Sequence, residues 1–276
     1  MRLSLPADLA SLVRLRNLLL GAVGVAIGGV LVTGRFGLAP EVAWAMASAF
    51  GLGAAGNIAN DLADLDADLV NRPGRPLVSG RISVNAAILL GGLLGAAGLF
   101  AAWWVDTRLF GLWLAALLVM LVYSPLLKQH GLAGNLAVAV VASLPPVYGA
   151  LAAGWPRAGL VPFAMGALLH FSRELVKDLE DVAGDRVQGR RTLPIVYGAE
   201  TTYLLAASAL ILFVPASLAP WFLHWYGRRY GLVVLLLDLG VLAVVWRLLG
   251  RQLAGARAAL KLGMLVGLAA LLWDRL

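Results

Sequence analysis

The acidic side chains of this chain are concentrated in two short segments. Nine of its fifteen Asp and Glu residues fall within 61–68 and 174–185, although the surrounding sequence is mostly Leu, Ala, Gly and Val. Each segment carries three aspartates spaced i, i+3 and i+7, which are Asp61, Asp64 and Asp68 in the first and Asp178, Asp181 and Asp185 in the second. At about 100° per residue, this spacing confines each trio to one helix face. The sequence therefore predicts two matching acidic faces.

Six carboxylates that lie close together predict a bound cation. Like charges at short range raise each other's pKa, so such carboxylates stay ionised only when cations lie between them. All-oxygen ligands favour Mg2+, Mn2+ or Ca2+, and Mg2+ is commonly held by a few carboxylates together with phosphate oxygens of a substrate. The pattern thus indicates a diphosphate substrate bridged by Mg2+. Basic residues that could neutralise the remaining phosphate oxygens are Arg72, Arg75, Lys128, Lys177 and Arg186.

The elements that must position these residues are membrane-spanning helices. Of the 276 residues, 61% are hydrophobic and 13% charged, and the mean hydropathy is +0.86, far outside the range of soluble domains. Apolar runs of about 20 residues, long enough to cross a bilayer, recur along the chain. We expect one transmembrane domain over 1–276, an all-α bundle of nine helices around a central cavity. The predicted spans are 16–34, 41–61, 83–104, 108–126, 132–153, 158–179, 201–221, 230–248 and 257–274.

The distribution of basic residues orients this bundle. Nine spans place alternate loops on opposite sides, and the side of the N-terminus receives sixteen of the 22 Lys and Arg residues, against six on the other side. We therefore expect a multi-pass protein of the cell membrane with its N-terminus and both acidic segments on the cytoplasmic side. The net charge of +7 then reflects topology and contact with the lipid bilayer, and does not indicate a nucleic-acid partner. The lack of cysteine excludes disulfides and thiolate metal sites.

Two other interpretations compete with a substrate site. Charged loops flanking membrane spans need no common helix face, and cytoplasmic loops favour Lys and Arg over clustered carboxylates. A cation transporter, the alternative from another functional class, also uses acidic residues, but transporters usually place them near the bilayer midplane on interrupted helices. Here the acids gather at one membrane face, where ionisable groups are costly and mark a site by default. A substrate site explains this placement better than either alternative.

The motifs resemble those of the UbiA superfamily of intramembrane prenyltransferases. The first family motif, N-D-x-x-D-x-x-x-D, is present at 60–68, and the second, D-x-x-x-D, at 181–185 ahead of GRRTLPIVYG. The stretch YSPLLKQHGLAGN at 123–135 is similar to the family's loop after the fourth span. The resemblance covers essentially the whole chain. It implies that Mg2+ and a polyprenyl diphosphate bind at the acidic motifs and that a prenyl acceptor attacks the carbocation that forms.

The resemblance also implies roles for individual residues. The expected Mg2+ ligands are Asn60, Asp64 and Asp68 for one ion and Asp181 and Asp185 for another, with Asp61 and Asp178 in support. The four ligand aspartates Asp64, Asp68, Asp181 and Asp185 are the expected catalytic carboxylates. Lys128 and Arg75 are expected to contact diphosphate, while Arg14, Arg16 and Asn17 approach the charged head of the acceptor. Tyr123 and Asn135 match the family by motif only.

The residues around the motifs bear on the acceptor. The stretch DLVNRPGRPLVSGRIS follows the first motif at once, and the second segment reads RELVKDLEDVAGDRVQGRRTLPI. Both look more like the archaeal ether-lipid branch of the family than like the aromatic prenyltransferases of quinone synthesis. Val78 departs from that branch, which often has Pro there. The resemblance implies transfer of a geranylgeranyl chain to the free hydroxyl of geranylgeranylglyceryl phosphate, with 4-hydroxybenzoate or a related quinone precursor as the alternative acceptor.

Overall fold

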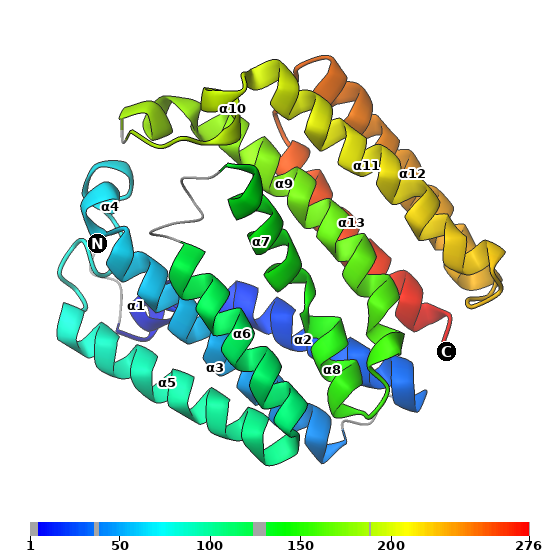
Figure 1. The fold of residues 1–276 in the computed structure, drawn as a ribbon, viewed down its shortest axis with the longest axis horizontal. Helices are drawn as coiled ribbons and strands as arrows, with labels where there is room; N and C mark the ends of the chain where they lie inside the picture. Colours follow the sequence, from blue (N-terminus) through cyan, green and yellow to red (C-terminus); the bar gives the residue numbers. More distant parts are fainter. Residues whose placement is uncertain (1–4, 36–38, 124–130, 188, 276) are drawn as a thin grey trace.

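The regular elements of the protein are helices throughout the part of the chain that the computed structural model describes, residues 5–35, 39–123, 131–187 and 189–275 (Figure 1). In chain order they are α1 (Leu5–Leu12), α2 (Leu15–Thr33), α3 (Pro40–Ala63), α4 (Leu65–Asn71), α5 (Val84–Val105), α6 (Thr107–Tyr123), α7 (Leu132–Ser143), α8 (Pro145–Ala152), the 3-10 helix η2 (Pro156–Gly159), α9 (Leu160–Val187), α10 (Leu193–Val196), α11 (Ala199–Phe222), α12 (Arg228–Leu249) and α13 (Ala256–Trp273). Figure 1 shows α3, α5 and α6 on one side and α9, α11, α12 and α13 on the other.

The predicted membrane spans coincide with these helices. Across the described ranges, seven segments are long and apolar enough to cross a membrane, namely α2, α3, α5, the α7–α8 pair, α11, α12 and α13. The other two predicted spans fall on α6, a shorter apolar helix, and on α9, which is apolar at its start and charged toward its end. The outer surface exposes large apolar side chains such as Trp246 and Leu236, 79% and 70% exposed, as contact with hydrocarbon requires. The chain is a multi-pass membrane protein.

One predicted span is interrupted. The stretch 132–153, expected as a single helix, is divided into α7 and α8 at Leu144. The next two residues, Pro145 and Pro146, have no backbone N–H to continue the helical hydrogen bonds, and a proline ring inside a helix clashes with the preceding turn. The Leu144 N–H instead bonds to the Val141 carbonyl at 3.3 Å, and α8 starts again with proline in its first turn. The chain changes direction at this break, which lies beside the cavity described below.

The first acidic segment is also divided. Helix α3 stops at Ala63, and α4 begins at Leu65, so Asp64 lies between the two helices with φ −95° and ψ 13°. The spacing of the three aspartates predicts that they lie along one straight helix, and this prediction is wrong, because the helix is interrupted at Asp64. The second segment does lie on one helix, because α9 continues for 28 residues to Val187, well beyond the predicted end at 179.

Helix α9 is central to the arrangement. It packs against α7 on one side and against α11 and α13 on the other. Its buried residues Leu169, Leu175 and Val176 join a core with Phe213 of α11 and Leu248 of α12. A second core, which includes Leu12 and Ile58, joins α1 and α2 to α3 and α5. The two acidic segments thus belong to two separately packed halves of the bundle.

Helices α2 and α8 cross in close contact. A Cβ added to Gly149 would lie 1.8 Å from the Val25 carbonyl oxygen, and one added to Gly28 would lie 2.0 Å from the Pro146 carbonyl oxygen. Small residues of this kind let helix backbones approach in lipid. This contact fixes α2 against the α7–α8 segment.

Candidate active site

A cavity of about 1020 Å³ lies between the halves of the bundle, lined by residues of α2, α3, α6, α7, α8, α9 and α13. Much of its wall is apolar, with Leu18, Trp113, Met120, Val138 and Met264 among the lining residues. The polar wall contains twelve of the seventeen residues singled out from the sequence: Arg14, Asn17, Asn60, Asp64, Asp68, Arg72, Arg75, Asn135, Lys177, Asp178, Asp181 and Asp185. Both acidic segments therefore face the same space.

The first acidic segment is held by two arginines. Asp61 is buried, and its Oδ1 accepts hydrogen bonds from Nη2 of Arg14 at 2.5 Å and Nη1 of Arg75 at 2.9 Å. The same Nη1 of Arg75 also donates to the buried Asp68. Arg14 stands at the junction of α1 and α2 with a left-handed φ of 56°, which is uncommon for a residue with a side chain. Asp61 does not itself line the cavity, and it acts here as an anchor for the two guanidinium groups that do.

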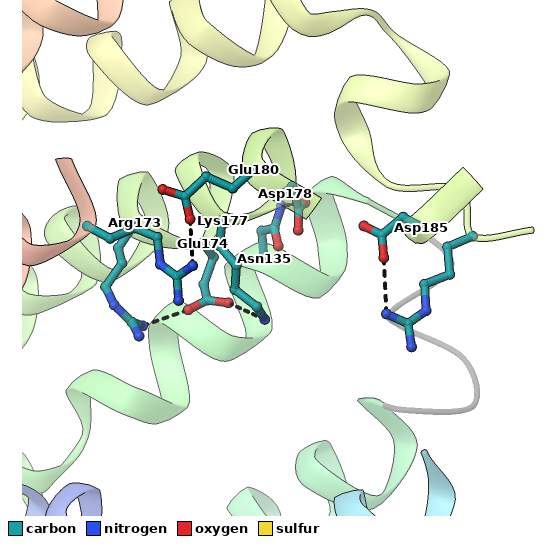
Figure 2. A network of polar contacts seen from close by, with 9 residues as sticks. Asn135, Arg173, Glu174, Lys177, Asp178, Glu180 and Asp185 are labelled. Atoms are coloured by element: carbon teal, nitrogen blue, oxygen red, sulfur yellow. Dashed lines mark hydrogen bonds and ion pairs between the residues drawn. The ribbon is translucent and has the colours of Figure 1, made fainter. Parts of the chain in front are cut away.

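The second acidic segment is partnered from other elements. Asp178 accepts a hydrogen bond from Nδ2 of Asn135 on α7 at 2.8 Å, and Asp185 accepts one from Nη1 of Arg190 at 3.1 Å (Figure 2). Asp181 lines the cavity between them and makes no hydrogen bond or ion pair within the described ranges. Asn135, which the sequence analysis selected only because it matches a family motif, thus contacts the second acidic segment.

Arg190 joins the two segments. While its Nη1 bonds to Asp185, its Nη2 lies 3.7 Å from Oδ1 of Asp64. The two acidic segments, 117 residues apart in sequence, are therefore bridged by one guanidinium group. Our sequence analysis did not single out Arg190, although it lies in the GRRTLPIVYG stretch that follows the second motif, and this position was the available signal.

A further group of ion pairs on α9 begins at Glu174, one turn before Asp178. Glu174 is buried and pairs with Arg173 at 2.8 Å and with Lys177 at 3.4 Å (Figure 2). Glu180 pairs with Arg257 of α13 at 2.5 Å. Arg173, Arg257 and the neighbouring Lys261 of α13 line the cavity as well, and the sequence analysis gave them no role at the site.

Five of the residues named from the sequence are not in the cavity wall. Asp61 lies behind it, as described above. Arg16 and Arg186 are exposed and do not contribute to the lining of the cavity in the described ranges. Lys128 lies outside the described residues, and the same holds for the side chain of Tyr123. The roles of these last two stay predictions.

The donor set of the cavity fits Mg2+. Every candidate ligand is an oxygen of Asp or Asn, which is the chemistry that Mg2+ prefers. No three acidic or histidine side chains of the described residues lie close enough together to hold a metal ion by themselves. This agrees with a Mg2+ ion held by one or two carboxylates and completed by water and substrate phosphate, the usual arrangement for this ion.

The fold and the cavity together define a class of protein. A membrane bundle that lines one end of an apolar cavity with two acidic segments is suited to a molecule with an anionic head and a long apolar tail. Comparison with family models matches residues 19–269 to the UbiA prenyltransferase family. The chain belongs to this family, so it is a membrane-embedded prenyltransferase rather than a cation transporter.

Individual relatives narrow the comparison. Digeranylgeranylglyceryl phosphate synthase of Hyperthermus butylicus is 33% identical over 98% of this chain and 97% of its own length. A solved structure of a digeranylgeranylglyceryl phosphate synthase matches with a TM-score of 0.83 and 25% identity, covering 98% of each chain. A UbiA homolog from Archaeoglobus fulgidus bound to GPP and Mg2+ matches with a TM-score of 0.73 and 20% identity, over 96% of this chain and 99% of that one. This last likeness establishes the shared fold.

Proposed function

We propose that this chain catalyses the Mg2+-dependent transfer of a geranylgeranyl group from geranylgeranyl diphosphate to geranylgeranylglyceryl phosphate. The observation that carries the proposal is the meeting of the two acidic segments across one cavity, with Arg190 between Asp64 and Asp185. The near full-length similarity to a digeranylgeranylglyceryl phosphate synthase supports the choice of acceptor. The solved homolog that holds GPP and Mg2+ supports the choice of donor class and of metal.

In this proposal the acidic segments bind the donor's diphosphate through Mg2+. Asp64 and Asp68, with Asn60, would hold one ion, and Asp181 and Asp185 would hold the other. Asp61 supports the first group through Arg75, and Asp178 supports the second through its hydrogen bond with Asn135. The chemistry that Mg2+ supplies when bound is neutralisation of the diphosphate and stabilisation of its charge as it departs.

Arginine side chains supply the remaining positive charge. Arg14, Arg75 and Arg190 line the cavity and already lie within reach of the carboxylates. Because a guanidinium group offers several N–H donors in a fixed plane, each can bind a phosphate oxygen while it keeps one carboxylate contact. These groups orient the diphosphate and hold its charge where the leaving group develops.

The transfer itself is a substitution at the first carbon of the prenyl chain. The bond between this carbon and the bridging oxygen breaks, and its electron pair leaves with the diphosphate. The glycerol hydroxyl oxygen of the acceptor forms the new ether bond, and its proton passes to the departing diphosphate. Leu18, Trp113 and Met120 belong to the apolar wall, which accommodates the prenyl chain and keeps water away from the reacting carbon.

The proposal includes an orientation in the membrane. The acidic segments lie near the ends of α3 and α9, on the side that carries sixteen of the 22 Lys and Arg residues of the chain. By the positive-inside tendency, this end of the cavity faces the cytoplasm. Such a placement lets water-soluble Mg2+ reach the site while the prenyl chains stay in the hydrocarbon.

A comparison of two acceptors tests the proposed function. The purified full chain, with Mg2+ and labelled geranylgeranyl diphosphate, is offered geranylgeranylglyceryl phosphate and 4-hydroxybenzoate in separate reactions. We expect kcat/KM for the lipid acceptor to exceed that for the aromatic acceptor by at least about a hundredfold, since polar sites reject substrates that leave their groups unpaired. The reverse ranking would rule out the ether-lipid function and leave the prenyltransferase class intact.

A further inference from the structure

A stripe of charged residues on α9 is separate from the proposed metal ligands. Arg173, Lys177 and Glu180 recur at intervals of four and three residues, so they share one helix face. Arg173 and Glu180 lie roughly 80° to 140° around α9 from the proposed ligands Asp181 and Asp185, whereas Lys177, one turn before Asp181, lies between the two groups. Figure 2 shows Arg173 and Glu180 at one end of the group and Asp185 at the other.

Helix α13 faces this stripe. Its Arg257 pairs with Glu180 at 2.5 Å, and α13 packs along α9. The two helices run in opposite directions, because Arg257 near the start of α13 contacts Glu180 near the end of α9 while Gly267, further along α13, lies against Met165 near the start of α9. Lys261, one turn after Arg257, is therefore level with the residues one turn before Glu180. That level is the level of Lys177. Lys261 lines the cavity, is exposed, and makes no hydrogen bond or ion pair with any part of the chain that the structure describes.

The contact between α9 and α13, called the seam below, contains more basic than acidic side chains. Arg173, Lys177, Arg257 and Lys261 all line the cavity, and their acidic partners are Glu174 and Glu180. Counting only the carboxylates in ion pairs with these residues, four positive charges thus face two negative ones, an excess of two; Asp178, the next carboxylate along α9, is hydrogen-bonded to Asn135 of α7 instead. By contrast, aspartates of the two acidic segments form ion pairs with the cavity-lining arginines Arg14, Arg75 and Arg190. A phosphate monoester carries a charge of about −1.5 to −2 near neutral pH, which matches this excess.

We propose that the seam between α9 and α13 is the binding site for the phosphate of the prenyl acceptor, with Lys177 and Lys261 as its direct ligands. The inference rests on the proposed function and adds to it a place for the acceptor's head, which the sequence analysis had assigned to Arg14, Arg16 and Asn17. Arg173 and Arg257 complete the cationic wall while they hold Glu174 and Glu180.

The position of the seam suits the reaction. Lys177 and Asp181 are one helical turn apart, about 6 Å along the axis of α9. The phosphate and the free hydroxyl of geranylgeranylglyceryl phosphate belong to the same glycerol unit, so a phosphate held at Lys177 keeps the hydroxyl within a few ångströms of the donor's diphosphate. The donor occupies the carboxylate side through its metal ions, and the acceptor occupies the cationic side. Two anionic heads thereby share one cavity without direct competition.

Charge removal at Lys261 tests the inference. Lys261→Gln, made in the full chain, is compared with Lys261→Arg, which keeps the charge, and with Arg251→Gln, which removes a cation from an exposed surface pair with Glu200 at the same end of the bundle. Since a charge-assisted hydrogen bond is lost, we expect KM for geranylgeranylglyceryl phosphate to rise about tenfold in Lys261→Gln. Arg251→Gln should stay within about twofold of wild type, Lys261→Arg should raise KM for the acceptor less than Lys261→Gln does because it keeps the charge, and KM for geranylgeranyl diphosphate should stay within about twofold in all variants.

Equilibrium binding separates this inference from the proposed function. Binding of geranylgeranylglyceryl phosphate and of geranylgeranylglycerol, which lacks the phosphate, is measured without Mg2+ and without donor. Wild type should prefer the phosphate lipid, and Lys261→Gln should lose about tenfold of that preference. An unchanged preference, or a rise in the donor's KM instead of the acceptor's, overturns the acceptor-phosphate site. If wild type binds the phosphate lipid through Lys261 but transfers nothing to it, the proposed function fails while the binding site stands.

Discussion

Arg75 holds the first acidic segment together, and its removal has a calculable consequence. Its side chain is 17% exposed, and its Nη1 donates to both Asp61 and Asp68, which are 5% and 7% exposed. In Arg75→Gln the charge is gone, so Asp68 loses its ion pair and Asp61 keeps only Arg14. Two buried carboxylates are then left with insufficient positive charge.

The size of the effect follows from burial. Removing one partner of a fully buried ion pair costs about 3–5 kcal/mol of unfolding free energy. Arg75 keeps some exposure and Asp61 keeps Arg14, so we expect a loss of about 3 kcal/mol without Mg2+. If the carboxylates bind Mg2+, the ion takes over the role of the guanidinium group. Mg2+ at a hundredfold excess over its Kd would return about 2.7 kcal/mol, which is most of the loss.

The assay is thermal unfolding in detergent, followed through the fluorescence of the nine tryptophans, with and without Mg2+. The matched control is Arg81→Gln, which removes the ion-pair partner of the buried Asp8. The two side chains lie 2.8 Å apart, and neither lines the cavity. Both variants should lose stability, and Mg2+ should stabilise Arg75→Gln more than Arg81→Gln, because only in Arg75→Gln does the ion replace a lost positive charge beside Asp61 and Asp68. Equal responses of the two variants to Mg2+ would refute the assignment of metal binding to the first acidic segment.

Two other predictions test the packing and the orientation. Gly149→Ala places a Cβ 1.8 Å from the Val25 carbonyl oxygen and should cost about 3 kcal/mol of stability. Gly92→Ala, with no atom within 4 Å of the new Cβ, should be neutral or stabilising by up to about 1 kcal/mol. Comparable losses in both variants would contradict the close contact of α2 with α8. Because the chain has no cysteine, single-cysteine variants report the topology. Gln252→Cys should react with an impermeant thiol reagent from the cytoplasmic side and Thr107→Cys from the opposite side, and the inverse pattern would show that the orientation is reversed.

The helices were predictable because their signal is local. A run of apolar residues long enough to cross a bilayer identifies a span without knowledge of its neighbours, and all nine predicted spans coincide with helical segments of the described ranges. The break before Pro145 was also readable, since two consecutive prolines interrupt the span, yet hydropathy alone favoured a continuous helix. The stop at Asp64 carries no comparable signal, because no proline or glycine adjoins it.

The sequence predicts which acidic residues form the site, but it does not predict which side chains contact one another. The repeated spacing of the aspartates predicts that both acidic segments share one site, and aspartates of both segments line the same cavity. Which cation contacts which carboxylate depends on how the two halves of the bundle are packed. Arg190 is therefore, in the sequence, one of many basic residues between predicted spans, although its side chain contacts both segments. Arg257 and Lys261, about 80 residues further along the chain from the second segment, depend in the same way on the packing of α13 against α9.

The central claim is that the two acidic segments form one diphosphate site through Mg2+. Equilibrium binding of geranylgeranyl diphosphate to the purified chain, measured with and without Mg2+, tests this claim most directly when wild type is compared with Asp68→Asn and Asp185→Asn. We expect Mg2+ to tighten donor binding to wild type at least about tenfold, and either single substitution to remove that gain while the protein stays folded. Donor binding that is still tightened by Mg2+ in both variants would contradict the claim.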